Sequence, residues 1–432
     1  MNAYNLADTY FVSRLGTGPL AAITFCFPVM MALRCIIRGL AAGAMTVVAH
    51  AIGRHDKGNA ASLTTHALVL GTVTMVVLAV AGFMTVPELL GMLGANEVTL
   101  PLAGAYIRIM YMGLVFMTVS MMAGSIMIAS GHVKMASFCI VLGTILNLVL
   151  DPIMIFGWLG FPALGIAGAA LATIISEGIA SAVALTILWR HFGLISIQIP
   201  SLSEMLAFWR SILRVAIPAT LSLILMPIST GIITRIVVQF GQSAVAAVGV
   251  ASRIEMFAFV IPMSIGMTLT PFVAQNFGAG RFDRIREARK ITMWFAFLYG
   301  LAVASLFFIF SNPIARIFTE DPPVQSILVT CIRIIAFGFG LMEVHRYATF
   351  FLTGLDGPVS AALLNGVRVI LLLVPLTLLG AWTLGLSGVF IARLLTDLTA
   401  GGLGIALTGK RGLRLLNLGM SPLTKTPQEL TA

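Results

Sequence analysis

Charged residues are scarce in this sequence. Only 10% of the 432 residues are charged, 59% are hydrophobic, and the mean hydropathy is +1.03. A soluble domain carries about 25% charged residues, and no soluble fold of this size buries so much apolar surface. The composition therefore excludes a soluble protein and predicts an all-helical membrane protein, because helices satisfy their own backbone hydrogen bonds within lipid.

Cysteine is also rare, and its placement argues against a metal or redox site built from cysteines. The four cysteines lie in apolar segments without CxxC or metal-ligand spacing, so we interpret them as small core residues. The net charge of +10 raises the possibility of a nucleic-acid partner. The cations cluster in short loops between apolar runs, however, which is typical of topology signals, so we expect no nucleic-acid partner.

Motifs for catalysis or nucleotide hydrolysis are missing. The sequence has no Walker loop, no H-E-x-x-H and no G-x-S-x-G. His345 beside Glu343 is too weak a signal for a metal site. We therefore expect neither an enzyme nor a protein fuelled directly by ATP, and no cofactor.

Long apolar runs are abundant, and a span needs roughly 20 such residues. Eleven runs qualify: 20–52, 63–90, 100–129, 135–159, 164–189, 211–239, 244–277, 288–311, 325–353, 359–381 and 384–408. Residues 1–15 would make a twelfth span but reach only about 22 Å of a core about 30 Å thick. We expect that Met1 lies inside the first helix of a longer product, or that the start is assigned late.

The charges of the loops predict the orientation. Five basic loops alternate with acidic or neutral loops at 87–97 and 318–323, and the basic ones are RHDKGN (54–59), HVK (132–134), RH (190–191), GRFDRIREARK (280–290) and KRGLR (410–414). The positive-inside rule places the basic loops and the C-terminus in the cytoplasm. We expect a bacterial-type inner membrane.

The two halves of the chain repeat each other. At a shift of 225 residues RLGTGPLAAI (14–23) aligns with QFGQSAVAAV (239–248), and VAHAIGRHDKG (48–58) aligns with VAQNFGAGRFD (273–283). At a shift of 220, LGIAGAALATIISE (164–177) aligns with LGLSGVFIARLLTD (384–397). The repeat predicts twelve transmembrane helices in two six-helix lobes related by a pseudo-twofold axis along the membrane normal. We expect lobes at 1–200 and 212–408, a cytoplasmic linker at 201–211 and a cytoplasmic tail at 409–432.

Three polar residues of the first half have no counterpart in the second. Asp8, Asn147 and Asp151 align with apolar positions, and Asn147 and Asp151 lie four residues apart on one helix face. Two carboxylates close together cannot both ionise cheaply and so store a proton, or with the amide and a nearby hydroxyl they ligate Na⁺. Alternatively, Asp151 caps the turn before Pro152 or bonds the backbone.

The chain resembles the MATE (multidrug and toxic compound extrusion) family, DinF-like branch. The resemblance spans nearly the whole chain and is carried by NLADTYFVSRLGTGPLAAI, IGRHDKGNAA, NLVLDPIMIFG, GVASRIEMF and VAQNFGAGR. It implies two lobes around a central cavity and export of cationic, amphipathic compounds in exchange for H⁺ or Na⁺. It also implies an ion site of Asp8, Asn147, Asp151 and Thr173, flanked by Tyr4 and Asn5.

The sequence departs from this family in the second lobe. Some members carry an acid in helix seven, where this chain has Met226 or a neighbour, which weighs against a second-lobe Na⁺ site. Glu343 in helix ten either takes up a proton or pairs with a neighbouring cation. We expect the substrate cavity to be lined by Tyr4, Asn5, Arg34, Arg38, Met226 and Glu343.

Two arginines lie well inside the span at 20–52, which is the second helix when residues 1–15 count as the first. Arg34 and Arg38 share a helix face, and an arginine at membrane depth indicates function by default. Either they line the cavity and bind an anionic group of the substrate, or they pair with Asp8, Asp151 or the acids of helix six. Arg393 with Asp397, and Arg253 with Glu255, we interpret as structural, and Glu177 stays open.

These observations predict a monomeric antiporter that exports small molecules and contacts lipid. The ion gradient drives multidrug efflux by alternating access, because ion and substrate favour different states. The alternative is a flippase for a lipid-linked oligosaccharide or another anionic substrate, which Arg34 and Arg38 favour. An intramembrane enzyme is the remaining class.

Overall fold

The computed structural model describes residues 10–97, 99–197 and 201–409, and every regular element in these ranges is helical. The chain divides into two units, Met1–Thr220 and Leu221–Ala432. The first unit contains α2 (Thr17–Gly53), α3 (Lys57–Met84), α4 (Val86–Met92), α5 (Thr99–Ala129), α6 (Val133–Phe156), the 3₁₀ turn Trp158–Gly160 and α7 (Ile166–Arg190).

The second unit follows the same plan with more interruptions. Its helices are α9 (Gln242–Ala258), α10 (Val260–Gly278), α11 (Phe282–Phe318), α12 (Pro322–Ile335), α13 (Phe339–Gly354), α14 (Pro358–Gly366) and α15 (Val374–Thr408). A 3₁₀ turn, Ala336–Gly338, joins α12 to α13, and a π-helical segment, Val367–Leu373, joins α14 to α15. The predicted linker, 201–211, lies almost wholly within α8 (Leu202–Val238), which crosses the division between the units.

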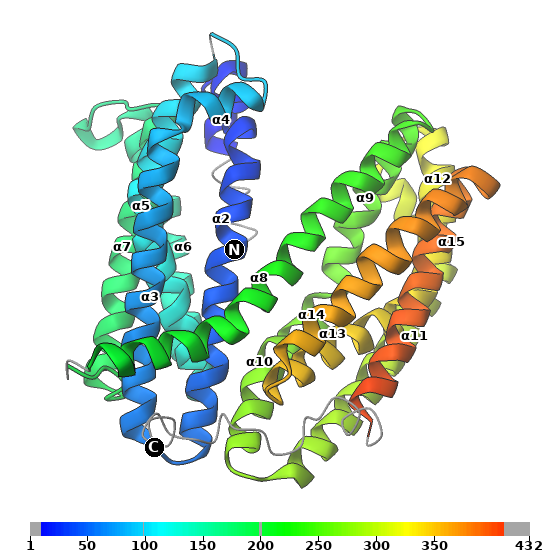
Figure 1. Ribbon diagram of the computed structural model, residues 1–432. Helices are drawn as coiled ribbons and strands as arrows, with labels where there is room; N and C mark the ends of the chain where they lie inside the picture. The colour runs from blue at the N-terminus through cyan, green and yellow to red at the C-terminus, as the bar shows by residue number, and fades with distance from the viewer. Residues whose placement is uncertain (1–9, 98, 198–200, 410–432) are drawn as a thin grey trace. The chain divides into compact units, whose positions relative to one another are not determined.

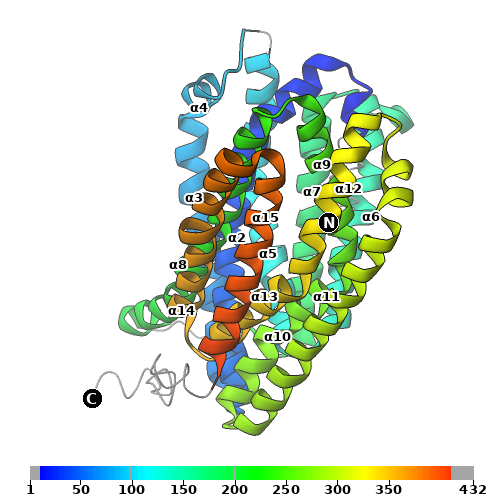
Figure 2. The same ribbon diagram turned by 90° about the vertical axis from the view of Figure 1, so that its right-hand side faces the viewer.

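One helical segment is central in each unit: α5 in the first, and α12 together with α13 in the second. In the first, α5 contacts α2, α3, α6 and α7, which run alongside it (Figure 1). In the second, α12 and α13 together contact α9, α10, α11 and α15 (Figure 2). Alanine and glycine at these contacts bring the helix backbones close together, as is typical of membrane helices.

The internal repeat is visible in the backbone. Four pairs of residues at the two shifts adopt left-handed conformations in both halves: Gly16 (φ 109°) with Gly241 (φ 95°), His55 (61°) with Gly280 (69°), Gly131 (82°) with Asp356 (65°), and Gly165 (57°) with Gly385 (63°). Each pair marks a break between consecutive helices. The turns of the two halves therefore share their geometry even where their residue types differ.

Three of the predicted spans look different in the structure, in two places. Span 244–277 is α9 and α10, which bend by 59° where they join at Phe259. Spans 359–381 and 384–408 form one helical stretch, Pro358–Thr408, which is broken at Gly385 (φ 63°, ψ −143°). In both cases hydropathy predicts where the chain is apolar and cannot tell whether the axis bends.

We expect Gly385→Ala to lower the melting temperature of the purified protein. At φ 63° and ψ −143° only glycine is unstrained, and a residue with Cβ costs about 1–3 kcal/mol there. The nearest atom to an added Cβ is 3.8 Å away, so the cost is backbone strain rather than a clash. Gly402→Ala, in the same helix with nothing within 4 Å of the added Cβ, is the matched control. An equal melting temperature for Gly385→Ala and Gly402→Ala would contradict the strain argument.

Candidate functional site: a buried polar cluster in the first unit

Asn147 and Asp151 lie one turn apart on α6, and both are fully buried. The helix forms because its residues are almost all apolar, and it ends at Gly157, whose left-handed φ of 76° suits glycine. Burial of a carboxylate is costly unless polar groups surround it. The position of Asp151 therefore needs polar neighbours, and the structure supplies them.

Thr173 joins the cluster from α7. The Asn147 amide nitrogen Nδ2 lies 3.3 Å from Oδ1 of Asp151 and 3.4 Å from Oγ1 of Thr173. The Thr173 hydroxyl donates its proton to the carbonyl oxygen of Ala169 at 3.0 Å, so its lone pairs face the cluster. The Asn147 amide oxygen Oδ1 has no hydrogen-bond partner among the described residues. The cluster thus offers carboxylate, amide and hydroxyl oxygens, the donor set that hard cations prefer.

The close approach of α6 and α7 makes the cluster possible. A Cβ on Gly168 would lie 2.3 Å from the carbonyl oxygen of Met154, so only glycine permits this distance. The second unit repeats the device, since Gly388 meets the backbone of Gly380 equally closely. Gly168 and Gly388 align in the repeat, so this contact belongs to the scaffold and the polar cluster is specific to the first unit.

Three of the predicted site residues lie outside the described ranges. Asp8, Tyr4 and Asn5 belong to residues 1–9. Their contribution from the first helix to the cluster of Asn147, Asp151 and Thr173 stays a prediction.

The two arginines of α2 differ in their surroundings. Arg34 is half-buried and interacts electrostatically with Glu177 of α7, which accepts a hydrogen bond from Ser120. Glu177 lies in the predicted span 164–189, which is helix six when residues 1–15 count as helix one. The structure therefore supplies a counter-charge of the expected kind for Arg34. Arg38 is exposed. Of the two, the exposed Arg38 is the better placed for a ligand.

The tentative residues of the second unit occupy different environments. Met226 on α8 is 69% exposed. Glu343 on α13 is buried, and its Oε1 lies 2.8 Å from the guanidinium of Arg346, three residues later. Glu343 therefore pairs with a neighbouring cation, which was one of the two alternatives that the sequence left open.

A second polar cluster was not predicted from the sequence. Arg393 of α15 forms a bidentate pair with Glu255 of α9, at 2.8 and 2.6 Å, and lies 3.9 Å from Asp397. Asp397 also binds Arg368 at 2.7 Å, and Arg368 lies in the π-helical segment. The spacing of Arg393 and Asp397 was visible in the sequence, but nothing in the sequence places Glu255 and Arg368 beside them.

The repeat relates the two clusters. At the shift of 220 residues, Thr173 of the first cluster aligns with Arg393 of the second. Where the first unit has a hydroxyl that can face a cation, the second has a side chain that is itself a cation. The acids of the second cluster, Glu255 and Asp397, each lie within 4.0 Å of an arginine, so this cluster is internally neutralised.

Comparison with known proteins agrees with this architecture. The profile of the MatE family matches residues 1–153 and 218–379. An FAD transporter of Shewanella oneidensis is 31% identical over 398 residues, which cover 92% of this chain and 88% of that protein. YoeA of Bacillus subtilis, described as a probable multidrug resistance protein, is 27% identical over 314 residues, covering 71% and 67%.

A solved structure confirms the fold. The MATE transporter VcmN of Vibrio cholerae, in its bent form, superposes with a TM-score of 0.90 at 28% identity, covering 96% of this chain and 93% of that one. The predicted all-helical, two-lobed membrane fold is therefore correct, while the DinF-like branch stays a prediction. Members of this family are integral membrane transporters of small molecules rather than enzymes. This chain belongs to the MATE family.

Proposed function

We propose that this protein is an ion-coupled exporter whose coupling ion, H⁺ or Na⁺, binds at Asn147, Asp151 and Thr173, together with Asp8. The observation that carries the proposal is the fully buried carboxylate of Asp151, which lies 3.3 Å from the amide nitrogen of Asn147. The same amide nitrogen lies 3.4 Å from the hydroxyl oxygen of Thr173. A buried ionisable residue in a membrane-spanning segment is costly and marks an ion pathway.

The chemistry of the cluster suits alternating access. With the ion bound, the negative charge of Asp151 is compensated and the dry, closed form of the site is favourable. Without the ion, the charge favours a state in which water reaches it. Substrate binds the ion-free, inward-facing state and is released when the ion binds from outside. Ion and substrate thus favour different states, and each displaces the other.

The exported compounds are expected to be amphipathic and cationic. Relatives such as YoeA, described as a probable multidrug resistance protein, support the export of varied organic compounds. The protein works as a monomer in a bacterial-type inner membrane with its C-terminus in the cytoplasm. The basic loops, including the start of α11 with Arg281, Arg284 and Arg286, support this orientation by the positive-inside rule.

Transport in inverted membrane vesicles tests the proposal. We would impose a proton gradient or a Na⁺ gradient, one at a time, and follow uptake of ethidium into the vesicles. Uptake that follows one gradient and collapses with the matching ionophore is the expected result and identifies the ion. Uptake that needs ATP, or that ignores both gradients, would overturn ion coupling.

Transport of an anionic substrate is a second candidate function. Arg38 is an exposed arginine inside a 37-residue apolar helix, and a relative that matches 92% of this chain is an FAD transporter. Arginine binds phosphate groups through paired hydrogen bonds. A lipid-linked anion, as a flippase would move, fits the same chemistry.

Substitution of Arg38 separates the two substrate classes. We expect Arg38→Gln to reduce transport of FAD by about tenfold, the loss for one charge-assisted contact, if the natural substrate is an anion. Ethidium transport should then be the same in the wild type and in Arg38→Gln, or absent from both. Arg54→Gln, at the end of the same helix, is a control for loss of a positive charge. Unchanged FAD transport in Arg38→Gln would exclude this role.

A further inference from the structure

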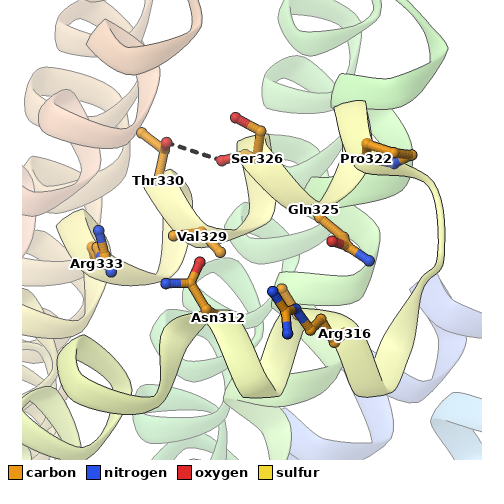
Figure 3. Close-up of a pocket in the computed structure, with 9 residues that line it drawn as sticks. Asn312, Arg316, Pro322, Gln325, Ser326, Val329, Thr330 and Arg333 are labelled. Carbon is orange, nitrogen blue, oxygen red and sulfur yellow. Dashed lines mark hydrogen bonds between the residues drawn. The ribbon is translucent and has the colours of Figure 1, made fainter.

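A groove between α11 and α12 has no role in the transport mechanism proposed above. It encloses a cavity of about 430 Å³ at the end of the second unit where these two helices join. Asn312 and Arg316 point from α11 toward the part of α12 that carries Gln325 and Val329 (Figure 3). Asn312 and Arg316 are four residues apart, as are Gln325, Val329 and Arg333, so two aligned helix faces form the walls.

The lining of this groove is cationic. Arg316 and Arg333 contribute two positive charges, Asn312, Gln325, Ser326 and Thr330 contribute neutral polar groups, and no carboxylate is among the lining residues. Arg316 is exposed and forms no ion pair or hydrogen bond with another described residue. Two cations from two helices with no acid between them attract an anion, and arginine favours phosphate in particular.

Arg333 is already held in place for such a role. Its Nε donates a hydrogen bond to Ser311 Oγ at 2.8 Å, and its guanidinium lies 5.5 Å from the ring centroid of Phe308. These contacts fix the plane of the guanidinium of Arg333, which is one of the residues that line the groove. Preorganisation of this kind lowers the entropy cost of binding a ligand.

An exposed aromatic surface adjoins the groove on the side of Arg333. Pro322 at the start of α12 and Arg333 are separated by eleven residues, or about 17 Å at 1.5 Å per residue. Phe308, which lies against Arg333, packs edge-to-face on Phe337 with ring centroids 5.8 Å apart, and both rings are about half exposed. A ligand whose anionic group lies between Arg316 and Arg333 can therefore extend over an apolar surface next to the groove.

The acids of the connecting loop lie outside the groove. Glu320 and Asp321 are exposed and precede α12, and neither lines the cavity. The walls of the groove are therefore free of carboxylates among the residues that line it, although the loop next to it is acidic.

We propose that this groove binds a phosphate group, with Arg316 and Arg333 as its ligands, and that the phosphate is carried by a membrane phospholipid whose acyl chains lie against Phe308 and Phe337. A soluble phosphate ester shares the same head chemistry. The half-exposed rings of Phe308 and Phe337 beside the groove favour the lipid.

Native mass spectrometry of the detergent-purified full chain tests this site. Phosphatidylglycerol, dioleoylglycerol and glycerol 3-phosphate would be titrated separately into wild type, Arg316→Gln and Arg333→Gln. We expect the apparent Kd for phosphatidylglycerol to rise about tenfold in each variant, the loss for one charge-assisted contact. Arg284→Gln, an exposed arginine at the other end of α11, is the control and should bind as wild type does.

The outcomes separate the two sources of phosphate. Binding of phosphatidylglycerol without binding of glycerol 3-phosphate supports the lipid. Competition by glycerol 3-phosphate supports a soluble phosphate ester in the same site. Wild-type affinity in Arg316→Gln and Arg333→Gln, or binding of dioleoylglycerol as tight as that of phosphatidylglycerol, would overturn the proposal. Because Arg316 is exposed, its variant stays informative even if Arg333→Gln folds poorly.

Discussion

Asp151→Asn is expected to abolish gradient-driven export while leaving the protein folded. The substitution keeps the shape of the side chain and its hydrogen bond to Asn147, which is 3.3 Å long in the wild type, but removes the negative charge. An amide does not take up a proton near neutral pH, and it has no negative charge to balance the charge of a bound Na⁺. Uptake of ethidium into inverted vesicles should therefore fall to the rate measured without a gradient, whichever ion is coupled.

The control for this variant is Asp283→Asn, at the start of α11. Asp283 is 95% exposed and, among the described residues, pairs with Arg286 at 3.4 Å. Its substitution makes the same chemical change as Asp151→Asn but leaves the buried site intact. Both proteins would be compared for expression and for a monodisperse peak in size-exclusion chromatography. Gradient-driven uptake at the wild-type rate in Asp151→Asn would show that the coupling ion binds elsewhere.

Glu255→Gln is expected to cause the largest loss of stability in the second unit. Arg393 would lose the negative charge of its bidentate partner and one of the two oxygens that it binds at 2.8 and 2.6 Å, and would remain a charge that is only 29% exposed. Removing one partner of such a pair costs about 3 kcal/mol. For a unit of roughly 200 residues this corresponds to a melting temperature about 5–10 °C lower, measurable by tryptophan fluorescence during heating.

A double variant separates the pair from its parts. Glu255→Gln with Arg393→Gln removes both charges, so it should melt closer to the wild type than Glu255→Gln alone, because no unpaired charge is left behind. Glu287→Gln, an exposed acid on α11, controls for loss of a negative charge and should leave the melting temperature unchanged. A double variant that melts below Glu255→Gln would contradict an isolated ion pair and indicate that Arg393 contributes through Asp397 instead.

The fold was largely predictable because membrane helices must be long and apolar. The apolar runs and the repeat placed the helices of both halves, since each depends on local sequence alone. The bend at Phe259 was not predictable. Pro262 follows it closely, but Pro28 lies inside α2, which stays a single helix over 37 residues. Whether a proline breaks a helix depends on the neighbours that satisfy the freed backbone groups.

The site was predictable to the extent that it is local. Asn147 and Asp151 are one helix turn apart, so their contact follows from spacing. Thr173 lies 26 residues further along the chain than Asn147, and only the resemblance to the family indicated it. The cluster of Glu255, Arg368, Arg393 and Asp397 unites three segments separated by up to 138 residues. Such contacts depend on tertiary packing, which cannot be inferred from the spacing of residues along the sequence.

Arg393 has a consequence for how energy enters the protein. A guanidinium keeps its proton at any physiological pH, and this one is bonded to the chain, so it never exchanges with the solution on either side of the membrane. An ion gradient performs work, about 2.3 kcal/mol per charge for each 100 mV, only on ions that enter from one side and leave to the other. At the position of Arg393 the second unit carries its cation permanently, and the charge of this side chain is the same at every step of a cycle. The free energy of a gradient is therefore used at a site that takes its cation from solution and releases it again, as we propose for the first unit.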